Sequence, residues 1–206
     1  MTLTLYGAAL SPYVRAVRAT FAEKGVEYQF ESIGPADLQK PDYAKRHPFR
    51  KLPALDVNGQ ALYETSAILR FIDEAHEGIQ LQPTDPLAKA RCEQWMSVAK
   101  SYLYPDLFTG LFFPRALAPQ FGMPVDEALI AVSTEKTRGH LAVIAEALTE
   151  GTLGAEDQIT LGDILVAAIL MPLEQIDEGH ELLAAVPAMA GWVGGFSRRS
   201  SFAGAS

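Results

Sequence analysis

The sequence predicts an α/β domain at the N-terminus, followed by an all-α domain. Residues 1–77 alternate strand and helix patterns in the order β-α-β-(loop or short helix)-β-β-α. From Pro86 onward, the apolar residues repeat at helical spacing, and no convincing strand pattern occurs. We place the domains at residues 1–77 and 87–206, joined by a proline-containing linker at 78–86. With 206 residues, of which 49% are hydrophobic, the chain can bury a core in each domain.

The first β-α-β unit is read from residues 2–31. Residues 2–6 are mostly apolar and rich in strand formers, so we expect a strand there. Ser11-Pro12 then opens a helix, because serine caps helix starts and proline fits the first helical position. The helix should end at Gly25. Alternation of apolar and polar residues over 26–31 predicts the second strand.

A tight hairpin and one more helix complete the first domain. Asn58-Gly59 separates two strand-like segments, residues 53–57 and 61–63, and this dipeptide is typical of a two-residue antiparallel turn. Thr65 follows and is expected to cap a helix whose apolar residues share one face. Those apolar residues are Ile68, Leu69 and Ile72.

The second domain is expected to consist of helices. Residues 91–102 and 126–149 carry apolar stripes at helical spacing. Between them, Pro105 and Pro114 should bend or interrupt the chain, because proline removes a helical hydrogen bond and clashes with the preceding turn.

A capping box predicts where the central helix of this domain begins. The Thr160 hydroxyl can cap the helix start, while Asp163, three residues on, can bond back to the Thr160 backbone. The helix behind it, residues 164–171, is apolar on nearly every face. We therefore expect it to run through the centre of the second domain.

Composition and charge exclude several classes of function. A net charge of −8 leaves no obvious basic face, so we expect neither a nucleic acid nor a membrane as partner. The single cysteine, Cys92, permits no intrachain disulfide, and the histidines lack ligand spacing, so we expect no metal. The N-terminus has no secretory signal pattern, and the longest apolar stretch, residues 164–173, is too short to span a bilayer. We expect a cytoplasmic protein that acts on small molecules.

Ser11 is the first candidate for chemistry. Pro12 keeps Ser11 out of helical geometry and leaves its hydroxyl near free backbone N–H groups. A thiolate brought there would meet a hydroxyl donor and the positive end of the helix dipole. Both lower the thiol pKa and raise the nucleophilic fraction at neutral pH. On its own, the pattern is also that of a plain capping serine.

Two further segments suit a ligand with peptide and amino acid groups. If the Leu52-Pro53 bond is cis, the Leu52 N–H and C=O turn outward, toward another peptide; the alternative is an ordinary edge-strand proline. Glu64 and Thr65 stand at a helix start, where Thr65 suits a carboxylate and Glu64 an ammonium group. The alternative is a capping residue preceded by a solvated acid.

Taken together, these segments resemble the glutathione transferase family, especially its serine-type phi and theta classes. Residues 11–17 are similar to the family's serine with an arginine four positions later, and residues 46–55 look like its Asn-Pro-Phe-Gly-Gln/Lys-Val-Pro-Ala-Leu motif, whose proline is cis. Residues 64–68 are similar to Glu-Ser-Xaa-Ala-Ile. In the second domain, residues 160–163 and the phi-like pattern over 95–105 complete the resemblance. It implies a thioredoxin-like first domain that binds glutathione and an all-α second domain.

The resemblance also implies residue roles. Ser11 would hydrogen-bond the glutathione sulfur, and the Leu52 backbone would pair with the cysteinyl unit. Glu64 and Thr65 would hold the ammonium and carboxylate groups of the γ-glutamyl end.

The resemblance leaves two candidates for the residue that binds the glycine end of glutathione. Lys51 would reach it, although the position is often glutamine in the family. Phi enzymes usually carry a histidine and a lysine near the position of Leu38-Gln39, and neither residue matches here. The glycyl carboxylate would therefore rely on Lys40 or on Lys51.

Two residues near Ser11 have open roles. Tyr6 is a rival to Ser11, because the tyrosine-type classes place their catalytic tyrosine near the end of the first strand. The Ser11-Pro12 helix start favours the serine. Arg15, one helical turn beyond Ser11, either adds positive field near the sulfur or serves as a structural ion-pair partner.

The activity implied is conjugation of glutathione to a hydrophobic electrophile by a homodimeric enzyme. The alternatives are glutathione-dependent peroxide or disulfide reduction at the same site, and a non-catalytic interaction module. The dimer would pair the first domain of one chain with the second domain of its partner, with residues 61–76 at the interface. Candidates for the electrophile pocket are Ala9, Leu10, Tyr13, Phe108, Phe112 and Phe113.

Overall fold

The structure is a computed structural model that describes residues 1–154 and 158–204. The chain divides into two compact units. The first comprises Met1–Gln82 together with the segment from Arg199 onward, and the second comprises Pro83–Arg198.

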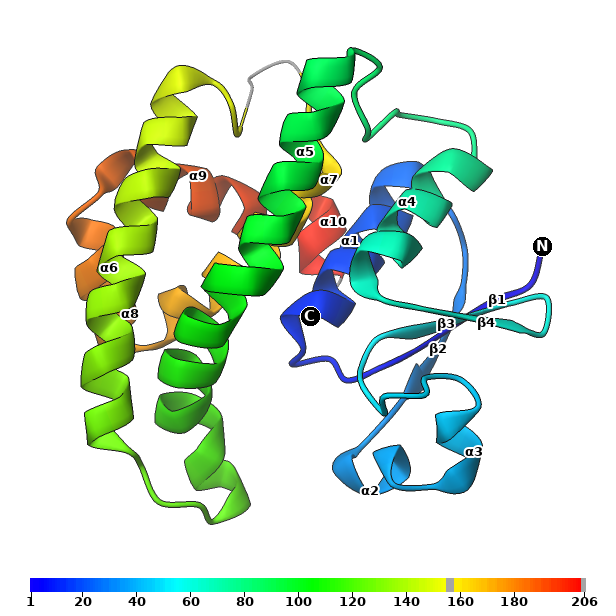
Figure 1. Cartoon of the computed structure of the whole chain (residues 1–206), viewed down its shortest axis with the longest axis horizontal. Coiled ribbons are helices and arrows are strands. Elements are labelled where there is room, and N and C mark those ends of the chain that lie inside the picture. The colour runs from blue at the N-terminus through cyan, green and yellow to red at the C-terminus, as the bar shows by residue number, and fades with distance from the viewer. Residues whose placement is uncertain (155–157, 205–206) are drawn as a thin grey trace. The chain divides into compact units, whose positions relative to one another are not determined.

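A mixed four-stranded sheet forms the centre of the first unit (Figure 1). Its strands are β1 (Leu3–Gly7), β2 (Gln29–Ser32), β3 (Ala54–Val57) and β4 (Gln60–Tyr63). They lie in the order β2-β1-β3-β4, with β1 and β2 parallel and the other pairs antiparallel. The predicted mixed sheet is confirmed.

β2 begins later than the alternation over 26–31 predicted. The preceding helix ends at Gly25, whose φ of 64° lets the Val26 N–H bond to the Phe21 carbonyl at 2.9 Å. Val26 is therefore part of the helix end. Tyr28 stacks on Phe21, with ring centroids 4.4 Å apart, and also precedes the strand.

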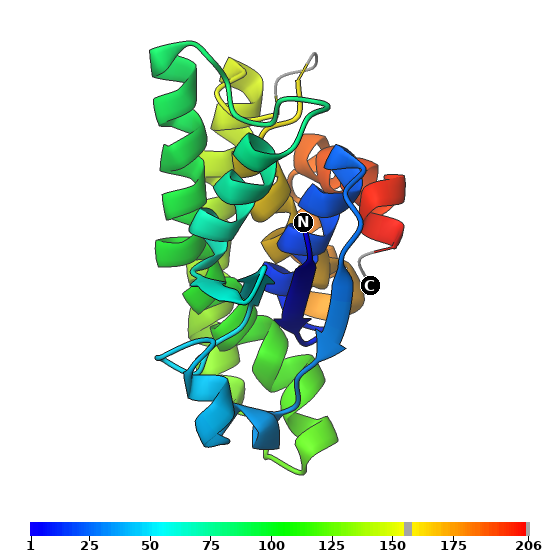
Figure 2. The ribbon, with the colours of Figure 1, turned by 90° about the vertical axis from the view of Figure 1, so that its right-hand side faces the viewer.

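Five helices belong to the described part of the first unit: α1 (Pro12–Lys24), α2 (Pro35–Leu38), α3 (Pro41–Ala44), α4 (Thr65–Ala75) and α10 (Ser200–Ala203). Helices α4 and α10 both pack against α1. Figure 2 shows β1 and β2 side by side, with their C-terminal ends directed toward the α2–α3 segment.

The hairpin is confirmed, and the start of α4 is corrected. Asn58 and Gly59 have φ angles of 53° and 87°, which the two-residue turn between β3 and β4 requires. Glu64, not Thr65, is the N-cap of α4, because the Glu64 carbonyl already accepts the first helical bond, from Ile68 N–H at 3.0 Å. Thr65 is the first helical residue.

A buried ion pair fixes the end of the first unit. Lys24 Nζ lies 3.1 Å from Asp73 Oδ1, and both side chains are at most 3% exposed. Lys24 also donates to the Asp73 and Ile79 carbonyls. The Asp73 carboxylate accepts from the backbone N–H groups of Leu81 and Gln82. The segment after α4 is thereby held against α1 and α4.

The regular elements of the second unit are all helices, and its described residues contain no strand. Its elements are α5 (Pro86–Val98), η1 (Ala99–Leu117), η2 (Ala118–Phe121), α6 (Glu127–Glu150), α7 (Leu161–Leu170), η3 (Met171–Gln175), α8 (Asp177–Ala184) and α9 (Pro187–Ser197). Every residue of α7 is buried, as predicted for the central helix. None of the described helices has both the length and the apolar character needed to cross a membrane.

Pro105 and Pro114 were expected to bend or interrupt the chain, and they do not interrupt it. Both prolines lie inside η1, a continuous segment wound with wider π-type turns. Proline cannot donate to the usual helical ladder, so a segment that contains two of them departs from regular α-helical bonding. Figure 1 shows α6 running beside η1, and the two pack against each other.

Candidate functional site

The register of the sheet gathers the candidate residues of the first unit at one edge. Tyr6 of β1 pairs with Ala54 of β3, and Ala54 pairs with Tyr63 of β4. Three segments just beyond these partners therefore lie at the same end of the sheet: residues 8–11 after β1, residues 51–53 before β3, and residues 64–66 after β4. Strand pairing alone brings Ser11, Leu52 and Glu64 to the same edge, although they are far apart in sequence.

Ser11 is the N-cap of α1, as predicted. Its backbone is extended, with φ −76° and ψ 122°, and its Oγ accepts a hydrogen bond from Val14 N–H at 3.4 Å. Its own N–H is bonded to the Ala8 carbonyl at 3.0 Å. A hydroxyl that accepts one bond can still donate its proton. The half-buried Ser11 is thus oriented by α1 and retains a donor for a ligand.

Tyr6 is covered on one face of its ring. The guanidinium carbon of Arg46 lies 4.4 Å from the Tyr6 ring centroid, a cation–π distance. Arg46 also donates to the Asp42 carbonyl at 3.4 Å, which ties the end of α3 to β1. Tyr6 therefore has a packing role that does not involve its hydroxyl.

The Leu52-Pro53 bond is cis, as predicted. Pro53 is buried and precedes β3, while Leu52 is half-buried and lies outside the ladder. Tyr43 donates to the Lys51 carbonyl at 2.7 Å, and burial raises the pKa of Tyr43 to about 12 against the opposing charge of Arg46. A neutral phenol therefore anchors the backbone just before Leu52.

The start of α4 holds three polar side chains of different exposure. Glu64 is exposed and has a φ of 74°, a left-handed conformation that non-glycine residues rarely adopt. Thr65 and Ser66 are 5% and 6% exposed. The buried Ser66 Oγ has no hydrogen-bond partner among the described residues. Backbone strain beside unsatisfied polar groups is typical of a ligand site.

His47 is a further candidate site residue that the sequence did not indicate. It is 2% exposed, its ring lies 5.0 Å from that of Tyr63, and its Nδ1 is buried without a partner among the described residues. Burial lowers the pKa of His47, the charge of Glu64 opposes this shift, and the charge of Lys51 adds to it. The available signal was that His47 stands where the family motif has asparagine.

The three cations near the α2–α3 segment differ in their partners. Lys40 Nζ lies 2.6 Å from Asp37 Oδ1, and this bond lowers the pKa of Asp37. Lys51 is exposed and has no carboxylate partner among the described residues. Arg50, at φ 53°, donates from Nη1 to the Gln39 carbonyl at 2.6 Å. Positive charge therefore borders this end of the site.

Comparison with known proteins identifies the chain. Residues 5–80 match the family model described as "Glutathione S-transferase, N-terminal domain". A glutathione S-transferase of Hyoscyamus muticus is 31% identical over 171 residues, covering 80% of this chain and 79% of the relative. Glutathione S-transferase 3 of Zea mays is 30% identical over 207 residues, covering 97% and 91%. The chain belongs to the glutathione S-transferase family.

A solved structure supports the same conclusion about the fold. The crystal structure of glutathione transferase F2 from Populus trichocarpa matches with a TM-score of 0.88 at 28% identity, over 98% of this chain and 96% of that one. The chain thus has the glutathione transferase fold, with a thioredoxin-like first domain and a helical second domain, and within the family it is phi-like.

The residues expected to contact an electrophile in this glutathione transferase family member differ in burial. In the first unit, Ala9 and Leu10 are exposed and Tyr13 is half-buried. In the second unit, Phe108 and Phe112 are 7% and 3% exposed. Their rings lie 5.5 Å apart, and the Phe113 side chain is half-buried. Leu10 is thus an accessible apolar group, whereas Phe108 and Phe112 also contribute to the helical core.

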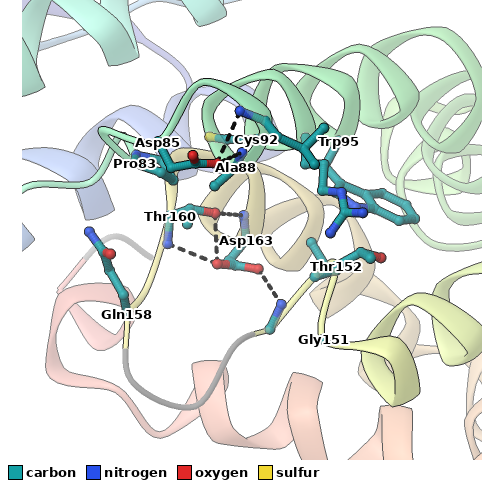
Figure 3. Close-up of a pocket in the computed structure, with 14 residues that line it drawn as sticks. Pro83, Asp85, Ala88, Cys92, Trp95, Gly151, Thr152, Gln158, Thr160 and Asp163 are labelled. Carbon is teal, nitrogen blue, oxygen red and sulfur yellow. Dashed lines mark hydrogen bonds between the residues drawn. The ribbon is translucent and has the colours of Figure 1, made fainter.

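A separate cavity of about 230 Å³ lies in the second unit, between the start of α5 and the start of α7 (Figure 3). Hydrogen bonds join several of its polar groups. Asp163 accepts from Thr160 N–H, the Thr160 hydroxyl and Gly154 N–H, which confirms the predicted capping box. Cys92 lines the cavity and is 5% exposed, and burial raises its pKa. This arrangement stabilises the start of α7 and presents no activated thiol.

Proposed function

We propose that this family member is a glutathione transferase that activates glutathione as a thiolate and conjugates it to a hydrophobic electrophile. One observation carries the proposal: the pairing of Tyr6 with Ala54, and of Ala54 with Tyr63, gathers the capping serine, the cis-proline segment and the start of α4 at one edge of the sheet. We assign glutathione binding to residues 1–77, and we propose that residues 87–206 contribute to the electrophile pocket.

Each end of the tripeptide would meet matching chemistry. Ser11 would donate to the sulfur, and the Leu52 backbone would pair with the cysteinyl unit. Glu64 would receive the γ-glutamyl ammonium group, and Thr65 with the first N–H groups of α4 would receive the carboxylate. Lys51 or Lys40 would hold the glycyl carboxylate. The strained Glu64 backbone and the unsatisfied Ser66 hydroxyl support a ligand at the start of α4.

The reaction follows from the state of the sulfur. The thiol loses its proton to water, and the hydrogen bond from Ser11 stabilises the resulting anion. The thiolate then attacks an electrophilic carbon, a C–S bond forms, and a leaving group departs or the adjoining π bond accepts the electron pair. Because the enzyme binds both the thiolate and the electrophile, it also orients them for the attack.

Ser11→Ala tests the proposal. The variant should raise the pKa of bound glutathione and lower turnover near neutral pH, while glutathione affinity is largely kept by the groups that hold the rest of the tripeptide. Loss of one hydrogen bond to a charged group costs about 1.5–3 kcal/mol. This corresponds to roughly one to two pKa units at ~1.36 kcal/mol each. The change in pKa is measured by following the thiolate absorbance of bound glutathione as the pH is varied.

Tyr6→Phe and Thr65→Ala are the matched controls for this titration. Tyr6→Phe should change neither the thiol pKa nor the rate, because the ring of Tyr6 packs under Arg46. Thr65→Ala should weaken binding more than it shifts the thiol. The assignment of Ser11 fails if Ser11→Ala keeps the thiol pKa and the rate of the parent protein while Tyr6→Phe loses both. A parallel panel of electrophiles, peroxides and mixed disulfides separates conjugation from reduction.

We also propose a cytoplasmic homodimer, by analogy with the family, with residues 61–76 at the interface. Light scattering should give twice the chain mass at micromolar concentration. A monomer mass under those conditions would refute the dimer.

A further inference from the structure

Arg15 is a buried cation without a partner among the described residues. Its side chain is 7% exposed, and both Nε and Nη1 are fully buried with no hydrogen bond. Guanidinium stays protonated under all ordinary conditions, so the charge is permanent. An uncompensated buried charge is costly, and native proteins usually pair such groups with a carboxylate.

The carboxylates of the helices packed on α1 are already occupied. On α1 itself, Glu23 accepts from Arg199 and Ser201. On α4, Asp73 is bound to Lys24, and Glu74 accepts from Gln82 at 3.3 Å. Helix α10 contains no acidic residue. Burial lowers the pKa of Arg15, and the like charge of Arg18 lowers it further. No group of these helices neutralises Arg15.

Arg15 also lies close to the proposed sulfur position. Its backbone N–H bonds to the Ser11 carbonyl at 2.9 Å, which closes the first turn of α1. Residues four apart share one helix face, with Cβ atoms about 5–6 Å apart. Long helical side chains lean back over the preceding turn, so we expect the Arg15 side chain to lean toward the end of α1 that Ser11 caps.

We propose that Arg15 is the counter-charge of the glutathione thiolate held at Ser11. The inference rests on the proposed function. Ser11 provides the hydrogen bond, and Arg15 provides the full positive charge that a lone hydroxyl cannot supply. The thiol proton leaves to water, and no bond of Arg15 changes. The bound anion compensates the buried guanidinium, so the ligand completes an ion pair that the free protein leaves half-formed.

Arg15→Met tests the proposal, because methionine keeps an unbranched, apolar stem and removes the charge. An opposite charge at this range shifts a pKa by about one unit or more, so the pKa of bound glutathione should rise by at least about one unit. Stability should be retained or increased, since replacing an unpaired buried charge by an apolar group removes a desolvation cost. The pKa is measured by titrating the thiolate absorbance against pH. The stability is measured by urea unfolding.

S-methylglutathione, which has no ionisable thiol, separates charge compensation from a structural role. Its affinity for Arg15→Met, measured by calorimetry, should equal that for the parent protein, while the affinity for glutathione above neutral pH should fall about tenfold. Arg15→Lys keeps a positive charge and should restore most of the thiol pKa shift. Arg18→Met is the matched control, because Arg18 already contacts Tyr28, Phe30 and the Gly204 carbonyl.

Three results would overturn the proposal: an unchanged thiol pKa in Arg15→Met, equal losses of affinity for both ligands, or loss of folding in Arg15→Met. The last two would show a structural role. Failure of the proposed function gives a different result, because the parent protein itself would then bind neither glutathione nor S-methylglutathione.

Discussion

Lys40 and Lys51 illustrate how single residues of the same type differ in what they can do for a ligand. Lys40 is bonded to Asp37 at 2.6 Å, and this bond raises the pKa of Lys40. Its charge is already matched within one turn of chain. Lys51 has no such partner among the described residues and directly precedes Leu52. An unmatched ammonium group is the better partner for an incoming carboxylate.

Lys51→Ala should therefore weaken glutathione binding more than Lys40→Ala. We expect about a tenfold rise in Kd for Lys51→Ala, equivalent to ~1.4 kcal/mol, and less than a threefold rise for Lys40→Ala. Calorimetry with glutathione gives both values. γ-Glutamylcysteine lacks the glycine and is the control ligand, which both variants should bind as the parent does. A larger loss for Lys40→Ala would reverse the assignment.

The residues that the sequence identified are those whose surroundings are local. Ser11 was recognisable because its neighbour Pro12 fixes the helix start. The Leu52-Pro53 segment was recognisable from its motif. His47 was not, because its burial beside Tyr63 depends on a strand that lies further along the chain. For Arg15, the sequence left two roles open, because it does not show whether a carboxylate is free to pair with the guanidinium. A sequence shows that a histidine or arginine is present, but not whether its partners are already taken.

Helix and strand boundaries depend on bonds made at their ends. The period-two alternation correctly predicted a strand after α1, but the Val26 N–H is used by the helix end. Thr65 was expected to be a cap, but the Glu64 carbonyl takes that position. Pro105 and Pro114 were expected to bend or interrupt a helix, which continues through them with π-type turns. In each case, the type of element was predictable and its boundary or winding was not.

The buried Lys24–Asp73 ion pair, which joins α1 to α4, should contribute measurably to the free energy of unfolding. Asp73→Ala leaves a buried ammonium group and unpaired N–H groups at Leu81 and Gln82. Breaking a buried pair on one side typically costs about 3–5 kcal/mol, so we expect a loss of that size in the free energy of unfolding. Urea denaturation measures it.

The double variant Lys24→Met/Asp73→Leu is the control for this loss. Because it removes both charges together, it should recover a large part of the stability. If Asp73→Ala lowers the free energy of unfolding by less than about 1 kcal/mol, the ion pair does not stabilise this part of the fold.

At the scale of the whole molecule, the chain returns to its first unit after completing the second. Arg199 and Ser201 both donate to Glu23 of α1, and Arg18 donates to the Gly204 carbonyl at 2.6 Å. Phe202 is fully buried. No local sequence pattern indicated this return, because it joins residues separated by most of the chain.

The contact between α1 and the C-terminal segment, residues 199–203, should weaken in acid. Burial of the Glu23 carboxyl opposes ionisation, but hydrogen bonds from Arg199 and Ser201 and the charge of Arg199 outweigh it, so the pKa of Glu23 lies below its usual 4.5. A lowered carboxyl pKa contributes stability that is present above the unfolded value and is lost as pH falls through the folded one. The free energy of unfolding should therefore decline below about pH 4.5.

Glu23→Gln should flatten this part of the pH profile, measured by urea unfolding at a series of pH values. Glu27→Gln, which alters an exposed acid close by in sequence, should leave the profile unchanged. If the two variants show the same profile, the contact between α1 and α10 does not depend on the charge of Glu23.

The returning segment also determines when during synthesis the site-bearing helix can be completed. Residues 199–203 are translated after the whole second unit, so α1 emerges from the ribosome long before its partner α10 exists. A nascent chain that has emerged from the ribosome as far as Gln82 contains all four strands and α4, but it still lacks Ser201, which donates to Glu23, and the buried Phe202. The helix that presents Ser11 and Arg15 therefore acquires its full set of contacts only late in translation.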